Sequence, residues 1–186
     1  GEIRDGETAS LAINASLTGH VVLSTIHTNS AAGAIPRFID MGAEPFLLVS
    51  TLKIVISQRL VRKLTSAKEQ YTLSDAEIKN IQKYIDLDRM MKFMVDEKIV
   101  APDATWQNIP FYRPVKNEES EDGYKGRLGI HEVLVVGPAI KEMILKGSSA
   151  DEIEKQAKAE GMMTMIEDGI YCAVQGLTSI EEVFRV

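Results

Sequence analysis

A short apolar run, Val21–Ile26, restricts the possible folds of this sequence most strongly. The run is too short for a helix and is rich in β-branched residues, which is typical of a strand buried on both faces within a parallel sheet. The segment before it predicts a helix that is capped by Asp5 and ends at Gly19. A buried parallel strand next to a helix favours an α/β fold.

The following segments continue this alternation. A second helix is predicted from Asn29 or Ser30 to about Gly42, and a third spans about residues 45–57, with proline in its first turn. Residues 58–64 alternate leucine with basic side chains, which favours another strand. Helix, strand, helix, helix and strand joined by short links indicate an α/β domain in this part of the chain.

Residues 65–122 are predicted to form a helical insertion. They are richer in charge, and Ser74-x-x-Glu77 is a capping box that precedes an apolar helical pattern. Residues 101–122 hold three of the six prolines and an acidic stretch, which is typical of a surface loop. Apolar packing of the insertion is expected from Ile78, Ile81, Met90, Met94 and Trp106.

The last part of the chain predicts one strand and four helices. The strand covers residues 131–136. Capping residues and glycines set the ends of the helices. The predicted helices run from Pro138 to Lys146, from the capping box Ser149-x-x-Glu152 to Gly161, from Thr164 to Gln175, and onward from Thr178-x-x-Glu181.

Composition and charge exclude several classes of function. The 21 basic and 27 acidic side chains give a net charge of −6, which disfavours binding to a nucleic-acid backbone. The single cysteine, Cys172, excludes a disulfide scaffold and a cysteine-rich zinc module. The longest apolar run, Ala43–Ile56, is interrupted by polar residues and is shorter than the roughly 20 residues of a membrane-spanning helix. The sequence opens on Gly1 with no initiator methionine or signal peptide, which we interpret as a piece of a longer polypeptide.

The three histidines do not predict a metal site. His20 and His27 are seven positions apart on the predicted extended segment, and an odd separation there points side chains to opposite faces. His131 lies far away in the sequence. These histidines are therefore not expected to close jointly on one ion.

His27 by itself has two interpretations. It lies at the carboxyl end of the predicted strand, where open α/β sheets bind ligands. Thr25, Thr28, Asn29 and Ser30 surround it with hydroxyl and amide groups just before a helix N-terminus, an arrangement suited to a phosphate. Alternatively, these residues only cap a helix, and His27 is a buried imidazole whose hydrogen bonds are satisfied. The pattern alone leaves both interpretations open.

Glu2 presents a similar choice. A carboxylate that ends a strand and precedes a helix is placed where nucleotide-hydrolysing α/β domains hold magnesium and its waters. Glu2 and Arg4 can equally be an ordinary exposed ion pair, with Asp5 serving only as a helix cap. No G-x-x-x-x-G-K-[ST] motif occurs, so these residues contain no phosphate cradle of their own.

The first 64 residues closely resemble the secretion ATPases that power type II secretion and type IV pilus assembly, from their Walker B glutamate through their His box. The resembling stretch is GEIRDGETASLAINASLTGHVVLSTIHTNSAAGAIPRFIDMGAEPFLLVSTLKIVISQRLVRKL. The pieces DGYKGRLGIHEVL, GMMTMIEDGI and GLTSIEEVFRV resemble the C-terminal region of the same family. The resemblance implies an α/β fold: residues 1–64 as the second part of a RecA-like P-loop ATPase core, residues 65–122 as a divergent helical insertion, and residues 123–186 as a return strand with a helical C-terminal subdomain.

The resemblance also implies roles for individual residues. Glu2 is implied as the Walker B acid that acts on the water shell of magnesium, and His20 and His27 as the His-box histidines, with His27 facing the γ-phosphate. Arg4 and Asp5 complete the Walker B signature. Many assembly and export motors carry a four-cysteine zinc knob where residues 65–122 lie, and this segment has no cysteine, so no zinc is expected.

The function implied by the resemblance is that of an ATP-hydrolysing motor. Such a motor forms a ring, expected to be a homo-hexamer, uses ATP and Mg²⁺, and works from the cytoplasm on a platform protein of the inner membrane. Assembly or export is favoured over retraction, because residues 139–146 lack the AIRNLIRE-like segment of retraction motors. Without a Walker A loop, these residues alone are expected to be inactive. The alternative is a non-catalytic module for oligomerisation and platform binding.

Overall fold

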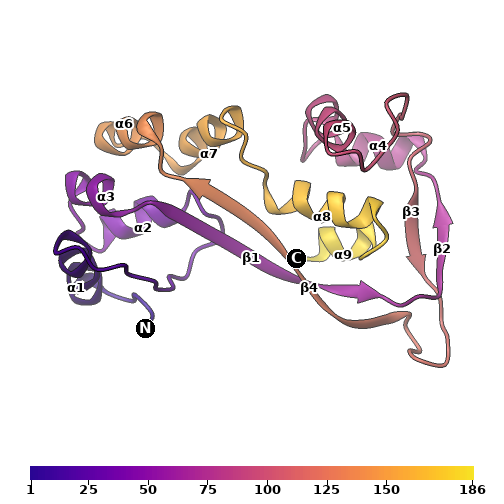
Figure 1. Ribbon diagram of the computed structural model, residues 1–186, viewed down its shortest axis with the longest axis horizontal. Helices are drawn as coiled ribbons and strands as arrows, with labels where there is room; N and C mark the ends of the chain where they lie inside the picture. Colours follow the sequence, from indigo (N-terminus) through magenta and orange to yellow (C-terminus); the bar gives the residue numbers. More distant parts are fainter. The chain divides into compact units, whose positions relative to one another are not determined.

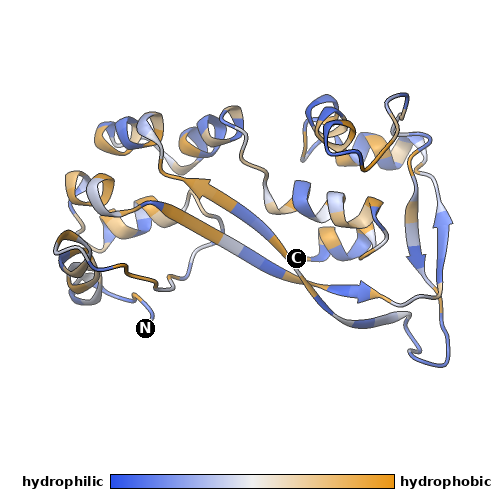
Figure 2. Cartoon of the chain, in the orientation of Figure 1, coloured by the Kyte–Doolittle hydropathy of each residue, from blue (hydrophilic) through white to orange (hydrophobic).

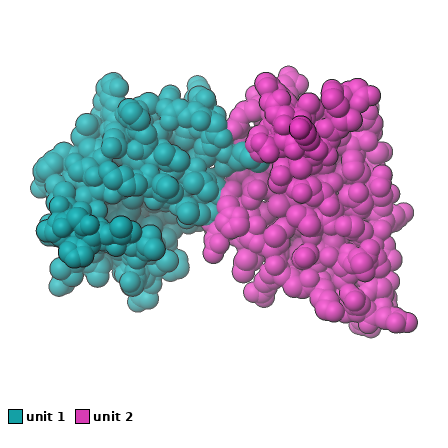
Figure 3. Space-filling view, in the orientation of Figure 1, with its two compact units in different colours: residues 1–57, 132–163 teal, residues 58–131, 164–186 magenta.

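The computed structural model describes residues 1–186, which form two compact units (Figure 3). Unit 1 comprises residues 1–57 and 132–163, and unit 2 comprises residues 58–131 and 164–186. Two strands run from one unit into the other, β1 (Ile54–Leu64) and β4 (Tyr124–Val135), and they pair as a two-stranded sheet. Residues 132–163 therefore pack with the N-terminal residues, a grouping that cuts across the predicted segment 123–186.

Unit 1 is mostly helical (Figure 1). Its helices are α1 (Gly6–Leu17), α2 (Ala34–Asp40), α3 (Pro45–Thr51), α6 (Pro138–Lys146) and α7 (Ala150–Ala159). One apolar cluster joins α2 to β4, α6 and α7, and a second lies among α1, α2 and α3. Figure 2 shows that the parts of β1 and β4 that belong to this unit are the more apolar parts of the two strands.

Unit 2 combines helices with a second pair of strands. Its elements, besides β1 and β4, are β2 (Lys68–Tyr71), α4 (Asp75–Ile81), α5 (Leu87–Asp96), β3 (Phe111–Pro114), α8 (Met165–Val174) and α9 (Ile180–Arg185). Strands β2 and β3 are antiparallel, with Lys68 opposite Pro114 and Tyr71 opposite Phe111. Val61, Ile130 and Cys172 form a buried cluster in this unit.

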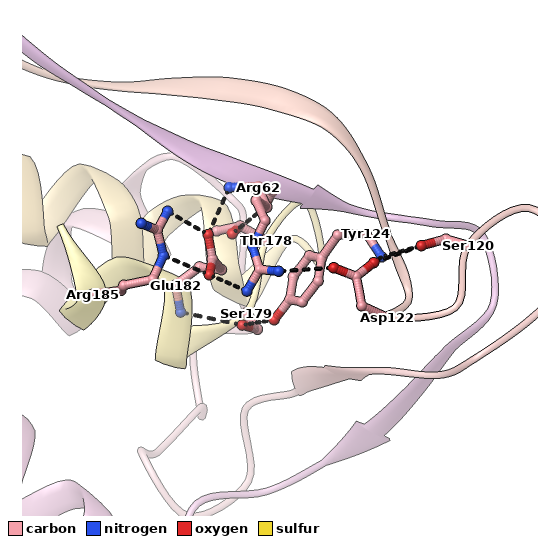
Figure 4. A network of polar contacts seen from close by, with 8 residues as sticks. All are labelled: Arg62, Ser120, Asp122, Tyr124, Thr178, Ser179, Glu182 and Arg185. Atoms are coloured by element: carbon pink, nitrogen blue, oxygen red, sulfur yellow. Dashed lines mark hydrogen bonds and ion pairs between the residues drawn. The ribbon is translucent and has the colours of Figure 1, made fainter.

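A polar network in unit 2 connects α9 to the two long strands (Figure 4). The Glu182 carboxylate accepts hydrogen bonds from the backbone and guanidinium of Arg62, at 2.9 and 2.7 Å, and from Arg185 at 2.8 Å. The Arg62 guanidinium also lies 4.2 Å from the centre of the Tyr124 ring and contacts Asp122 at 2.8 Å. The charged groups of this network therefore find hydrogen-bond and ion-pair partners within unit 2.

Most of the predicted helix boundaries are confirmed, because they depend on local caps. The Asp5 side chain accepts the Thr8 N–H at 2.8 Å in a reciprocal capping box at the start of α1. Ser74, Ser149 and Thr164 cap α4, α7 and α8 in the same way. α6 covers the predicted residues and ends at a left-handed glycine, Gly147, with φ 71°.

The prediction of a fully buried strand at Val21–Ile26 is wrong. The segment makes one parallel bridge, between Thr25 and Glu2, and Val21 and Leu23 are 90% and 89% exposed. A strand becomes buried on both faces only when other elements cover it, and here the packing reaches only Ile26, which contacts the α1–α3 cluster. Strand pairing and cover depend on distant residues, so they are not encoded within these six residues.

Two further helix predictions in unit 1 need correction. α2 starts at Ala34 instead of Asn29 or Ser30, because residues 31–33 form a turn whose Gly33 N–H is accepted by the Ser30 hydroxyl at 3.1 Å. α3 ends at Thr51, not near residue 57, and the β-branched residues that follow it enter β1, where they pair with β4. The strand predicted over residues 58–64 is the continuation of β1.

Unit 2 and the strand that leads out of it differ from the predictions in three places. The strand predicted over residues 131–136 is the end of β4, which already begins at Tyr124. Residues 65–122 are not wholly helical, because β2 and β3 pair across the segment, and β3 lies within the predicted loop, between Pro110 and its own last residue Pro114. α9 is capped by Ser179, whose hydroxyl accepts the Glu182 N–H at 3.3 Å, and not by Thr178, whose hydroxyl donates to the Arg62 carbonyl. The five apolar side chains expected to pack in the insertion are buried: Ile78, Ile81, Met90, Met94 and Trp106. No helix is long and apolar enough to cross a bilayer.

Candidate functional site

The structure brings Glu2, Arg4 and His27 into contact in unit 1. Oε1 of the Glu2 carboxylate lies 3.0 Å from His27 Nε2. Oε2 accepts a hydrogen bond from Arg4 Nε at 2.7 Å and forms an ion pair with Arg4 Nη2 at 2.6 Å. The Glu2 side chain is 20% exposed, whereas the His27 side chain is 93% exposed. One carboxylate therefore holds two potential cations at the surface.

Backbone pairing produces this contact. The parallel bridge places Glu2 beside Thr25, and the Ile3 N–H donates to the Thr25 carbonyl at 2.7 Å. Ile3 is buried with the α1–α3 cluster, while its neighbours Glu2 and Arg4 project the other way, as expected of an extended segment. His27 follows Thr25 by two positions, so both ends of the carboxylate–imidazole pair are fixed by the same bridge.

Helix α1 begins immediately after this segment. The Asp5 cap fixes the direction of the chain, and Gly6 lies so near the Met41 carbonyl that a Cβ there would approach its oxygen to 2.4 Å. Only glycine fits this contact without displacement. The close approach of α1 to the end of α2 thus supports the backbone on which Glu2 lies.

The charges of the site favour an anionic Glu2. Hydrogen bonding from Arg4, followed by the Arg4 charge and that of His27, lowers the pKa of the Glu2 carboxyl below its ordinary value. The Arg4 pKa is raised by the same contact. Hydrogen bonds from Thr8 lower the pKa of Asp5. Glu2 is therefore ionised at neutral pH and available to interact with a cation or its bound water.

The remaining predicted site residues divide into two groups. Thr28 follows His27 and donates from its hydroxyl to the Ser30 carbonyl at 2.9 Å, while Thr25 and Asn29 are exposed nearby in the chain. His20 lies at the end of α1, where its Nδ1 contacts the Thr18 hydroxyl at 3.1 Å and the Ala15 carbonyl at 3.3 Å. Of the two His-box candidates, His27 contacts Glu2, and His20 contacts the C-terminal end of α1.

The interpretation of His27 as a buried imidazole is wrong, because its ring is almost fully exposed. The accompanying idea of a simple helix cap is also wrong in detail: Ser30 accepts from Gly33 within a turn, and α2 begins only after that turn. The loop therefore presents an imidazole to solvent next to a carboxylate.

Sequence reasoning missed Glu132 on β4. This glutamate is 3% exposed, and its Oε1 accepts the Ala31 N–H at 2.7 Å, in the turn that follows His27. An acidic residue that alternates with the apolar residues Ile130 and Leu134 is the signal that could have identified it. The residues it joins are 101 positions apart in the sequence.

The side chains at the site suit magnesium, which keeps part of its water shell, better than a metal ion whose ligands all come from the protein. No group of three or more histidine, cysteine, aspartate or glutamate side chains is arranged to hold a metal ion. Magnesium commonly keeps several waters and binds one or two carboxylates together with substrate phosphates. The single carboxylate of Glu2 fits that role, whereas it does not provide the ligands of a structural zinc site.

Comparison with known proteins identifies the family. The model of the family described as "Type II/IV secretion system protein" matches residues 1–185, so the chain belongs to that family. It is 44% identical over 187 aligned positions to "Type II secretion system protein E" of Xanthomonas campestris pv. campestris, covering 100% of this chain and 30% of that protein. It is 42% identical to "Type IV pilus assembly ATPase PilB" of Thermus thermophilus, covering 98% of this chain and 19% of that protein.

Solved structures give the same fold. The whole chain aligns with 35% of the Yersinia pseudotuberculosis ATPase DotB at a TM-score of 0.60 and 19% identity. It aligns with 37% of the pilus retraction motor PilT, solved with bound ADP, at a TM-score of 0.59 and 22% identity. The mixed helix and sheet architecture is therefore that of an α/β secretion ATPase. The chain spans less than a third of the length of the two curated relatives.

Proposed function

We propose that these residues act within a longer ATPase that powers type II secretion or type IV pilus assembly. The support is family membership together with relatives of 44% and 42% identity that are named for these two systems. In this proposal the catalytic pair is Glu2 and His27, with Arg4, His20, Thr25, Thr28 and Asn29 near the nucleotide phosphates.

The contact between Glu2 and His27 carries the proposal. An ionised carboxylate that ends an extended segment suits a role in holding the water shell of magnesium, and the ion would neutralise phosphate charge when bound. When both ring nitrogens of the exposed imidazole carry a proton, Nε2 can donate to Glu2 while Nδ1 donates a hydrogen bond to a γ-phosphate oxygen. Arg4 keeps Glu2 ionised and oriented, since it bonds the oxygen that His27 does not contact.

The assembly we propose is a homo-hexameric ring that works on a platform protein at the cytoplasmic face of the inner membrane. These residues contain no Walker A motif, so in this proposal ATP is held mainly by other parts of the polypeptide. The second candidate is a non-catalytic module for ring formation and platform binding, which the exposed apolar side chains Val21 and Leu23 favour.

The decisive experiment uses the longer protein and measures ATP hydrolysis, nucleotide binding and melting temperature. Glu2→Gln keeps the size of the side chain but removes its charge, so hydrolysis should fall by about 100-fold while nucleotide still binds. His27→Ala should reduce hydrolysis by about ten-fold or more without lowering the melting temperature, because the ring is exposed.

His20→Ala is the matched control for His27→Ala. His20 contacts the end of α1 through Thr18 and Ala15, so we expect a smaller loss of hydrolysis and a small loss of stability. Wild-type hydrolysis in both Glu2→Gln and His27→Ala would exclude the catalytic assignment and favour the non-catalytic module.

A further inference from the structure

We propose that Glu132 is a positioning residue for the His27 loop, a role that rests on the proposed function of His27. Glu132 is 3% exposed, and its Oε1 accepts the Ala31 N–H at 2.7 Å. It does not contact the nucleotide in this proposal. It acts through the backbone of residues 28–33, the bend and turn between His27 and α2, here called the turn.

Strand β4 presents a continuous inner face to this turn. Glu132 and Leu134 in β4 and Val136, directly after its end, alternate along the chain and are all buried, as expected of one face of an extended segment. Leu134 and Val136 pack in one apolar cluster with Ala31 and Ala32. The same strand therefore holds the turn by apolar contact and by a hydrogen bond.

The turn is built for close approach to the strand. Ala31 and Ala32 are completely buried, and their small side chains allow the backbone to lie near β4. Within the turn, the Thr28 hydroxyl donates to the Ser30 carbonyl and the Ser30 hydroxyl accepts from Gly33. These hydrogen bonds set the conformation of the turn, and the hydrogen bond from the Ala31 N–H to Glu132 attaches the turn to β4.

The chemistry of the contact explains why a carboxylate stands at this position. A buried carboxylate is unfavourable unless it is hydrogen-bonded, and a bond from a backbone N–H to a charged acceptor is stronger and shorter than one to a neutral acceptor. The turn is thereby fixed at Ala31, four residues after His27, while Glu2 contacts the imidazole itself. Two carboxylates thus define the place of one exposed histidine.

The test compares Glu132→Ala, Glu132→Gln and Glu167→Ala in the longer protein. Glu167 is the matched control, because it is 1% exposed and paired with Arg89 at 2.7 Å in unit 2. Glu132→Ala should lower kcat about ten-fold and leave ADP affinity within about three-fold. Glu132→Gln should retain kcat within about three-fold, since its amide oxygen can accept the same N–H. Glu167→Ala should lower the melting temperature at least as much as Glu132→Ala without this loss of kcat.

A second readout is independent of catalysis. Deuterium exchange at the Ala31 amide should accelerate at least about ten-fold in Glu132→Ala and remain unchanged in Glu167→Ala. Unchanged exchange, wild-type kcat in Glu132→Ala, or equal losses in the Ala and Gln variants would overturn the positioning role. If Glu2→Gln and His27→Ala reduce hydrolysis as proposed while Glu132→Ala leaves it at the wild-type rate, only this proposal fails. If neither of those two variants affects hydrolysis, the proposed function itself fails.

Discussion

Glu2 in unit 1 and Glu182 in unit 2 both contact arginine, but their surroundings differ. Glu182 is almost completely buried and accepts bonds from Arg62 and Arg185, whereas Glu2 is partly exposed and borders an exposed imidazole. Every bond of the Glu182 network lies within unit 2 (Figure 4). The comparison shows that a buried carboxylate with several hydrogen-bond donors is suited to stabilising the fold. An accessible carboxylate next to a potential donor is suited to a role in catalysis.

The largest expected effect on stability is that of Glu182→Ala. It removes the acceptor for two guanidinium groups and for the Arg62 N–H, so we expect the free energy of unfolding to fall by about 2–4 kcal/mol. Denaturant unfolding measures the change. Glu181→Ala, at the exposed neighbouring position, is the control and should change stability by less than about 0.5 kcal/mol. Equal effects of the two variants would show that the network does not stabilise unit 2.

An acid titration sharpens the same comparison. Burial raises the pKa of Glu182, but hydrogen bonds from Arg185 and Arg62 outweigh it and lower the pKa from 4.5 to about 2. Since the folded pKa lies below the unfolded one, the stabilisation is present above about pH 4.5 and is lost as the pH falls toward 2. The pH dependence of unfolding in this window should be flatter in Glu182→Gln than in wild type. Identical slopes would contradict the assignment.

The smallest effect on stability is expected from Arg4→Ala. Arg4 is 75% exposed and its pair with Glu2 lies at the surface, so the denaturation midpoint should not change measurably. Arg62→Ala is the matched comparison and should lower the midpoint, because Arg62 lies on the Tyr124 ring and pairs with the buried Glu182. Equal losses of stability would show that burial is not what distinguishes the two carboxylates.

The fold was predictable wherever short-range interactions decide it. Asp5, Ser149 and Thr164 cap helices through bonds to residues three positions away, so their sequence pattern contains the whole interaction. The end of α3 was not predictable in this way, because the residues after Thr51 gain their hydrogen bonds from β4, distant in the sequence. The cap of α9 failed for a related reason: Thr178 satisfies the Arg62 carbonyl, which leaves Ser179 as the cap.

The candidate site also has a part that the sequence predicts and a part that it does not. The residues themselves, Glu2 and His27, follow from the sequence and its resemblance to secretion ATPases. The parity argument for His20 assumed a continuous strand that does not form, and His20 is separated from His27 because it contacts the end of α1. Their 3.0 Å contact depends on the bridge between Glu2 and Thr25, and the support of the loop depends on Glu132. By itself, the sequence determined the helix caps of α1, α7 and α8 and the chemical types at the site, because each is a property of neighbouring residues. Only the tertiary structure decided which apolar segments are covered and which carboxylates are buried, because burial and pairing are set by segments that meet from distant parts of the chain.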